Sequence, residues 1–334
     1  MAYEPKVMQQ ATARLLRRRE IRERKRYDLE QELYRREPRL RELDRAIRGT
    51  MSELTELAVC GRPVEADGPE ITEIRARNLE LQARRAELLK GLGYEADALD
   101  DKPSCALCGD TGWAGNEMCA CLKELCAKEQ MKALTALLNL TEEQTFGKLR
   151  LDVYSNTVWP GAERSPREHM TRVIAVCEGF ARQFPHYPLK NLLLSGGTGL
   201  GKTFLSGCIA REVSERGCSV VYDTAINLFA AFETRKFTRD AAEERQARDD
   251  TRRYLSCDLL ILDDLGSELT TPLAQSTLYE VVNSRLQADK CTIISTNLSM
   301  EQIRQRYTAQ IASRIEGLYR ELTFYGQDIR LNQH

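Results

Sequence analysis

No stretch of this sequence stays apolar over the roughly 18–20 residues that a membrane-spanning helix needs, and no signal-peptide pattern is present. Net charge is also nearly absent, because 49 Lys and Arg residues against 50 Asp and Glu residues leave −1. The overall charge therefore excludes no class of partner. We expect a cytoplasmic protein without a membrane partner, long enough at 334 residues to hold two or three structural units.

The cysteines lack the arrangement of a disulfide framework. Their number, eleven, is odd, and five of them lie between residues 105 and 126. A reducing compartment with one local metal site fits this distribution better than paired disulfides do. Two close pairs, C-x₂-C and C-x-C, predict a structural Zn²⁺ site whose four thiolate ligands are Cys105, Cys108, Cys119 and Cys121. Cys126 is an alternative ligand, and a redox C-x₂-C is the competing interpretation.

Hydrophobic residues recur at every seventh position near the N-terminus, first at Leu33, Leu40, Ile47 and Leu54, then at Ile74, Leu81 and Leu88. The pattern predicts coiled-coil helices over residues 9–58 and 70–90, with an interruption at Pro38. The two helices would form an antiparallel hairpin, or a lone helix would pair only within an oligomer. The basic run over residues 14–26 is either the solvated face of this coiled coil or a nucleic-acid patch, and we favour the solvated face.

The most specific motif lies between Gly196 and Thr203, where the sequence reads G-G-T-G-L-G-K-T. A strand-like apolar run precedes it and a helix-compatible run follows it, as in a P-loop. Glycines let backbone N–H groups point at phosphate oxygens, and the next helix adds its positive N-terminal end. Lys202 is expected to reach the β- and γ-phosphates, and Thr203 is expected to hold Mg²⁺. The predicted nucleotide-binding residues are Gly196, Gly197, Thr198, Gly199, Leu200, Gly201, Lys202 and Thr203.

Two further apolar runs that are typical of strands are followed by polar residues. The run over residues 257–262 is followed by Asp263 and Asp264, and the run over residues 291–295 is followed two positions on by Asn297. In a buried parallel sheet, Asp263 would lie beside the P-loop and hold the Mg²⁺ water shell. Asp264 would orient or deprotonate an attacking water, and Asn297 would contact that water or the γ-phosphate.

The order of these motifs resembles the AAA+ ATPases, and more narrowly the bacterial helicase loaders of the DnaC/DnaI type and the IstB transposition helpers. The resemblance is carried by GGTGLGKTFLS, DLLILDDLGSE, the STN tip and the closing SRI…FYGQDIR, and it covers residues 146–330. It implies ATP as the nucleotide, Asp264 as the catalytic acid, Asn297 as a sensor and Arg314 as an arginine finger for a neighbouring subunit. Many AAA+ proteins have Glu where this chain has Asp264, which implies slow hydrolysis. We expect no C-terminal lid of the usual kind, and whether Arg330 substitutes for the arginine of that lid is left open.

The expected fold is α/β, with a P-loop AAA+ parallel sheet flanked by helices and no C-terminal lid. We expect a helical coiled-coil region over residues 1–100, a zinc-binding segment over residues 101–127 and the ATPase domain over residues 128–334.

The resemblance implies a replication protein that uses ATP and Mg²⁺ to load a hexameric replicative helicase onto single-stranded DNA, with self-association or a ring-associated assembly. Candidate DNA contacts are Arg235, Lys236, Phe237 and Arg239. The alternative, which we favour on the sequence alone, is that these residues belong to a solvated charged insert. The alternatives are an IstB-like helper that acts on duplex DNA with a transposase, a P-loop kinase of a small molecule and an interaction module with an inert nucleotide site.

Overall fold

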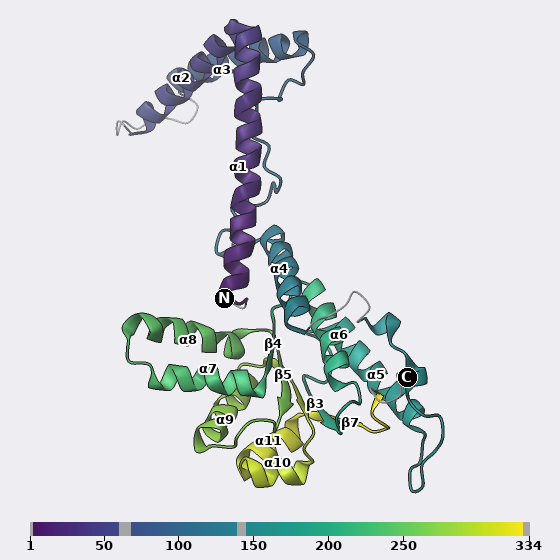
Figure 1. Cartoon of the computed structure of the whole chain (residues 1–334). Helices are drawn as coiled ribbons and strands as arrows, with labels where there is room; N and C mark the ends of the chain where they lie inside the picture. The colour runs from purple at the N-terminus through teal and green to yellow at the C-terminus, as the bar shows by residue number, and fades with distance from the viewer. Residues whose placement is uncertain (1–2, 60–67, 139–144, 330–334) are drawn as a thin grey trace. The chain divides into compact units, whose positions relative to one another are not determined.

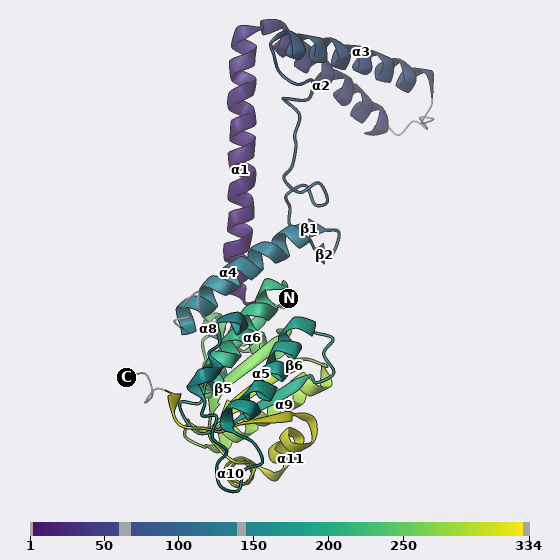
Figure 2. The same ribbon diagram turned by 90° about the vertical axis from the view of Figure 1, so that its right-hand side faces the viewer.

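A computed structural model describes residues 3–59, 68–138 and 145–329 of the chain (Figures 1 and 2). The chain divides into two compact units, a helical unit at Leu15–Gly115 and a sheet unit that combines Met1–Arg14 with Asn116–His334. This division differs from the three predicted segments in two ways. The first fourteen residues join the sheet unit, because Tyr3, Val7 and Ala11 form a buried apolar stripe. The other boundary falls inside the cysteine segment.

Three helices account for most of the first ninety residues: α1 (Pro5–Arg36), α2 (Pro38–Val59) and α3 (Pro69–Gly91). Pro38 is the first residue of α2, so the predicted interruption is confirmed. Proline is tolerated there because the first residue of a helix has no intrahelical partner for its N–H group. The core of the helical unit is small and consists of Leu33, Leu40, Leu89 and Leu99, with partly buried neighbours around them.

Helices α2 and α3 run antiparallel and lie side by side (Figure 2). Near the middle of the pair, Asn78 Nδ2 donates to Thr50 Oγ1 at 2.5 Å. Farther along, Arg85 forms an ion pair with Asp44 at 2.8 Å. Residues earlier in α2 therefore contact residues later in α3, as expected for antiparallel helices. The predicted antiparallel hairpin is confirmed, while its turn, at residues 60–67, lies outside the described residues.

The sheet unit contains five parallel strands in the order β4-β5-β6-β3-β7. They are β3 (Asn191–Gly196), β4 (Val220–Thr224), β5 (Leu259–Leu265), β6 (Cys291–Thr296) and β7 (Arg320–Phe324). The expected α/β fold is confirmed. The prediction lacked β7, which lies at the edge of the sheet and buries only Leu322 and Phe324. Because all strands are parallel, their carboxyl ends meet at one edge, where ligands bind in such sheets.

Helices cover both faces of this sheet (Figure 1). Alternate side chains of the strands form two apolar clusters, one on each face. The first cluster packs against α4 (Ala120–Leu138), α5 (Pro166–Gln183) and α6 (Lys202–Glu215). The second packs against α7 (Ala225–Phe237), α8 (Ala241–Ser256), α9 (Pro272–Gln287), α10 (Met300–Arg306) and α11 (Ala309–Leu318). Two short 3₁₀ turns, Phe146–Lys148 and Leu151–Val153, precede α5.

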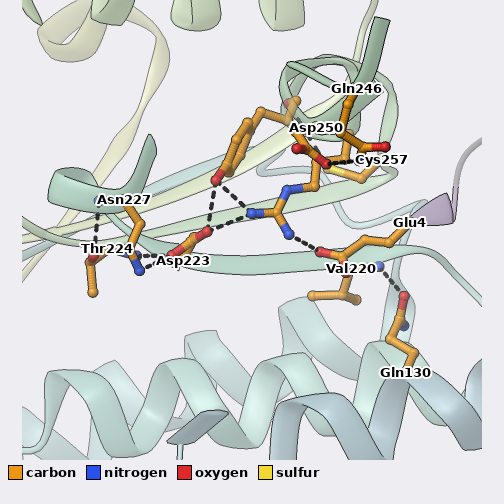
Figure 3. A network of polar contacts seen from close by, with 11 residues as sticks. Glu4, Gln130, Val220, Asp223, Thr224, Asn227, Gln246, Asp250 and Cys257 are labelled. Atoms are coloured by element: carbon orange, nitrogen blue, oxygen red, sulfur yellow. Dashed lines mark hydrogen bonds and ion pairs between the residues drawn. The ribbon is translucent and has the colours of Figure 1, made fainter. Parts of the chain in front are cut away.

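A polar network attaches the start of α1 to the sheet unit (Figure 3). The carboxylate of Glu4 pairs with the guanidinium of Arg253 at 2.6 Å, and Arg253 also contacts Asp223 at 2.9 Å. The hydroxyl of Tyr254 donates to the same Asp223 oxygen at 2.7 Å. The other oxygen of Asp223 accepts from the backbone N–H of Thr224 at 2.9 Å. The network therefore connects α1 to the carboxyl end of β4.

Candidate nucleotide site

The loop between β3 and α6 has the backbone shape of an anion site. Gly199 and Gly201 have φ values of +71° and +94°, which residues with side chains rarely adopt. A Cβ atom on Gly199 would also overlap the carboxylate of Asp328. The loop ends where α6 begins, at Lys202, so the positive N-terminal end of that helix opens toward the loop. The predicted glycines thus lie where their backbone N–H groups are available to phosphate.

The ammonium of Lys202 lies at the mouth of this loop. It donates to the carbonyl oxygens of Gly196 at 2.7 Å and Gly197 at 2.6 Å. It also donates to Asn297 Oδ1 at 2.6 Å. Asn297 follows the end of β6, which is the neighbour of β3. The fold therefore brings the predicted P-loop lysine and the predicted sensor asparagine into direct contact.

Asp263 and Thr203 meet beside the loop. The hydroxyl of Thr203 donates to Asp263 Oδ2 at 3.1 Å, and Asp263 is buried near the end of β5. A hydroxyl and a carboxylate are oxygen ligands of the kind that Mg²⁺ prefers. This pair fits the predicted magnesium site, in which the ion would supply positive charge to the phosphates.

Asp264 has an unusual backbone conformation. Its φ is +56°, in the left-handed region, and the pairing of β5 with β6 shifts register between Leu262 and Leu265. Such a bulge bends the strand and redirects side chains. Asp264 lines the same cavity as Lys202, and Asn297 Nδ2 approaches its carboxylate at 3.3 Å. The fold thus brings both predicted aspartates to the P-loop. Asp263 is buried there, and Asp264 is exposed.

The cavity at this edge has a volume of about 1220 Å³. One wall consists of residues that the sequence did not single out, among them Leu149, Val153 and Tyr154, with Ile329 beside them. The hydroxyl of Tyr154 donates to the carbonyl of Leu200 at 2.9 Å, and burial raises its pKa to about 12. The wall therefore adds apolar surface next to the phosphate loop, as ligand pockets usually do.

Arg314 is absent from the described residues that line this cavity. Its guanidinium stacks on the ring of Tyr279 at 4.7 Å and donates to Asn283 Oδ1 at 3.2 Å. An ion pair with Glu316 would be an alternative role for Arg314, but the carboxylate of Glu316 pairs with Arg304 at 2.8 Å. Arg314 therefore presents its charge on α11 beside α9, away from the nucleotide site of its own chain. Arg330 lies outside the described residues.

The sulfur atoms of Cys105, Cys108, Cys119 and Cys121 lie within 4.8 Å of one another. Four thiolates at about 2.3 Å from a tetrahedral Zn²⁺ would be about 3.8 Å apart, so the cluster fits this metal. Two short strands, β1 (Trp113–Ala114) and β2 (Glu117–Met118), pair in the same segment. Cys126 lies outside the cluster, with its Sγ 3.4 Å from Met8 Sδ.

Asp110 supports the first cysteine pair and was not predicted. It adopts a left-handed φ of +62° and is buried. Its carboxylate accepts from the backbone N–H groups of Ser104 at 2.9 Å and Cys105 at 2.8 Å, and it pairs with Arg22. These bonds fix the turn that carries Cys105.

Ion pairs neutralise part of the basic run in α1. Within the helical unit, Arg22 pairs with Asp101 at 3.2 Å, Arg26 pairs with Asp101 at 3.6 Å, and Arg19 pairs with Glu23 at 2.8 Å. These pairs are in keeping with a solvated helix face that also binds its own unit.

The candidate DNA contacts at the end of α7 divide into two kinds. Arg235 pairs with Glu280 at 3.0 Å and stacks on the Phe232 ring at 4.5 Å. Arg235 therefore connects α7 to α9 through Glu280 and is not an unpaired surface cation. Phe237 is 65% exposed, which leaves its ring open for stacking.

Comparisons with known proteins match the part of the chain that contains this site. Residues 187–315 match the family described as IstB-like ATP binding protein. The replicative helicase loader DnaC of Escherichia coli strain K12 is 24% identical over 127 residues, which are 38% of this chain and 50% of DnaC. The loader DnaI of Bacillus subtilis strain 168 is 25% identical over 120 residues, 36% of this chain and 37% of DnaI. A crystal structure of DnaI is 21% identical with a TM-score of 0.44, and the match covers 60% of this chain and 100% of that one.

The chain thus spans half or less of the length of these curated relatives. Within the described residues, no helix is long and apolar enough to cross a membrane. The matched residues contain the P-loop, both aspartates, Asn297 and Arg314. Residues 187–315 therefore resemble the IstB-like ATP binding proteins, and the chain is similar over part of its length to the loaders DnaC and DnaI.

Proposed function

We propose that this chain is an ATP-dependent replication protein that binds a hexameric replicative helicase and loads it onto single-stranded DNA, with ATP binding and hydrolysis as the switch. The observation that carries the proposal is the contact between Lys202 and Asn297 beside the Thr203–Asp263 pair. Four groups of a P-loop ATPase, contributed by three segments, converge on one cavity. The DnaC and DnaI matches supply the helicase and the DNA as the expected partners.

The residues of the site have separable roles in this proposal. Lys202 holds the β- and γ-phosphates, so its present bonds to Gly196 and Gly197 would give way to phosphate oxygens. Thr203 and Asp263 would hold Mg²⁺. Asp264 accepts a proton from the attacking water or orients it, and Asn297 fixes the position of that water. A short aspartate at position 264 favours slow turnover, stimulated by a partner or by DNA.

Two substitutions test the ATPase site. Lys202→Ala should abolish ATP binding, because the phosphates lose their point charge inside the loop. Asp264→Asn should bind ATP and stop hydrolysis, since Asp263 and Thr203 are retained. Equilibrium binding of a fluorescent ATP analogue and phosphate release measure the two effects. Normal hydrolysis by Asp264→Asn would move the catalytic role to another residue.

Capture of the host helicase tests the loader proposal. The immobilised chain should retain the hexameric helicase in ATP and release it in ADP, and Lys202→Ala should not distinguish the two nucleotides. The family match of residues 187–315 favours one alternative, an IstB-like helper that acts on duplex DNA with a transposase. That alternative predicts ATP-dependent binding to duplex rather than single-stranded DNA and no helicase capture.

For single-stranded DNA, we propose the end of α7 as a contact. Phe237 offers an exposed ring, and Lys236 and Arg239 are exposed cations beside it. Phe237→Ala should weaken binding of a fluorescent single strand by about ten-fold, since stacking contributes roughly 1–3 kcal/mol per base. Arg235→Ala is a poor test, because Arg235 holds α7 to Glu280.

Arg314 is proposed as the arginine finger of an assembly of several chains. The planar guanidinium of Arg314 is suited to phosphate oxygens. Arg314 lies on α11 and does not line the nucleotide cavity of its own chain. Arg314→Ala should bind ATP normally but hydrolyse it poorly. Mixed with Lys202→Ala chains, it should regain part of its activity, because intact fingers then meet intact P-loops. An inactive mixture together with an active wild-type monomer would exclude a finger in trans.

A further inference from the structure

The carboxylate of Asp263 accepts more hydrogen bonds than the motif alone requires. Thr203 approaches Oδ2 at 3.1 Å, and the hydroxyl of Tyr222 donates to the same oxygen at 2.6 Å. The other oxygen, Oδ1, accepts from the hydroxyl of Ser295 and from the backbone N–H of Asp264 at 3.1 Å. All four donors come from protein groups, so the orientation of this carboxylate is set before any ligand binds.

Strand pairing explains how Tyr222 reaches Asp263. Tyr222 lies opposite Ile261 in the parallel pair β4–β5, and Asp263 is the next residue of β5 on the same face. The long tyrosine side chain therefore spans one residue and ends at the carboxylate. Tyr222 is only 5% exposed, so the hydrogen bond from its hydroxyl to Asp263 is buried.

Ser295 acts on both aspartates. Its hydroxyl donates to Asp263, and its oxygen accepts from the backbone N–H of Asp264 at 3.0 Å. Ser295 is fully buried on β6 at the place where the pairing with β5 shifts register. The bond to the Asp264 N–H stabilises the left-handed backbone there, which aspartate tolerates better than most residues with side chains.

We propose that Tyr222 and Ser295 are positioning residues for the two aspartates. Tyr222 holds the Asp263 carboxylate beside Thr203, where the pair would bind Mg²⁺. Ser295 holds the bulge that turns Asp264 toward the cavity. This inference rests on the proposed ATPase function. It assigns the geometry of that site to Tyr222, which lies outside the motifs, and to Ser295, a residue of the STN tip for which the sequence predicted no role.

The first test removes the Tyr222 hydroxyl. Tyr222→Phe should raise the Mg²⁺ concentration for half-maximal ATP turnover by about ten-fold, since a charge-assisted hydrogen bond is lost. ATP binding in the absence of divalent ions should stay as in the wild type. The matched control is Tyr319→Phe, because Tyr319 is a buried tyrosine of the opposite apolar cluster and does not line the cavity. Thermal unfolding separates a loss of fold from a change in the metal site.

The second test concerns Ser295. Ser295→Ala should lower turnover about ten-fold at saturating Mg²⁺ with ATP affinity nearly unchanged, because the Asp264 backbone loses its acceptor. Ser295→Thr, which keeps the hydroxyl, should restore most of the activity.

The outcomes distinguish this inference from the proposed function. An active wild type with the same Mg²⁺ dependence in Tyr222→Phe and Tyr319→Phe overturns the role of Tyr222. Full activity of Ser295→Ala overturns the role of Ser295. A wild type that neither binds nor hydrolyses ATP removes the proposed function and, with it, both positioning roles.

Discussion

The sheet unit and the helical unit are stabilised in different ways. In the sheet unit, two apolar clusters cover both faces of the sheet, and the buried guanidinium of Arg285 makes several hydrogen bonds. Arg285 donates to the carbonyls of Tyr254 at 2.8 Å, Cys257 at 3.1 Å and Cys291 at 2.6 Å. Among the described residues, the core of the helical unit is a cluster of four leucines with partly buried apolar neighbours, and ion pairs lie around it.

This difference predicts which unit loses its fold when one core residue or the metal is removed. Burial of a leucine side chain contributes about 1.5–3 kcal/mol, so a unit with four such residues has little stability in reserve. Exposed ion pairs add about 0–1 kcal/mol each. We propose that the cysteine segment, which is too small for a core of its own, needs a bound metal to fold. Folding of the helical unit should therefore be more sensitive to change than nucleotide binding by the sheet unit.

The largest expected effect is that of metal removal. We propose one Zn²⁺ per chain on Cys105, Cys108, Cys119 and Cys121. Cys105→Ser should abolish stoichiometric zinc and unfold the cysteine segment, with loss of helicase capture, while ATP binding by the sheet unit persists. Elemental analysis, limited proteolysis and nucleotide titration measure these effects.

Cys126→Ser is the matched control, because Cys126 contacts Met8 and lies outside the cluster. It should retain the metal. Zinc retained in Cys105→Ser but lost in Cys126→Ser would replace the proposed ligand set. Loss of ATP binding on metal removal would contradict the independence of the two units.

A smaller effect is expected from equal truncations in the two cores. Leu40→Ala and Leu260→Ala each remove a fully buried leucine, and each should cost about 2–5 kcal/mol. Leu40→Ala should abolish the cooperative thermal unfolding of the helical unit, because three large residues of its core remain. Leu260→Ala should lower the melting temperature of the sheet unit but leave ATP binding measurable. A helical unit that melts normally after Leu40→Ala would show that its stability lies outside this core.

The sequence predicted the parts of the site that belong to motifs on buried strands. Asp263 and Asn297 each follow a continuous apolar run, which is typical of a parallel strand covered on both faces. Such strands end at the same edge, so their proximity to Lys202 follows from the fold class. The same reasoning missed β7, because its exposed residues Arg320, Glu321 and Thr323 resemble a loop.

The positioning contacts depend on register, which the sequence does not reveal. Tyr222 reaches Asp263 because β4 and β5 pair Tyr222 with Ile261. Ser295 reaches Asp264 because a bulge shifts β5 against β6. A tyrosine and a serine in apolar strands otherwise look like ordinary core residues. One signal in the sequence could have indicated these roles. Each residue is polar and lies near the carboxyl end of a strand next to the strand that carries Asp263 and Asp264.

The smallest effect concerns the attachment of α1 to the sheet unit. Glu4 and Arg253 are 24% and 26% exposed, so their pair is partly screened, and Arg253 keeps Asp223 when Glu4 is neutralised. Glu4→Gln should lower the free energy of unfolding by about 1 kcal/mol or less. Glu53→Gln in the helical unit breaks a pair with Arg77 in which both side chains are about half exposed, and it should have no measurable effect.

Asp223→Ala should cost more, about 2 kcal/mol or above, because the Tyr254 hydroxyl and the Thr224 N–H both lose their acceptor inside the protein. Urea unfolding of the sheet unit measures Asp223→Ala and Glu4→Gln, and urea unfolding of the helical unit measures Glu53→Gln. The expected order places Asp223→Ala first, Glu4→Gln second and Glu53→Gln last, because burial of the charge decreases in that order. If Glu4→Gln were more destabilising than Asp223→Ala, the network would depend on the N-terminal pair rather than on the buried carboxylate at the end of β4.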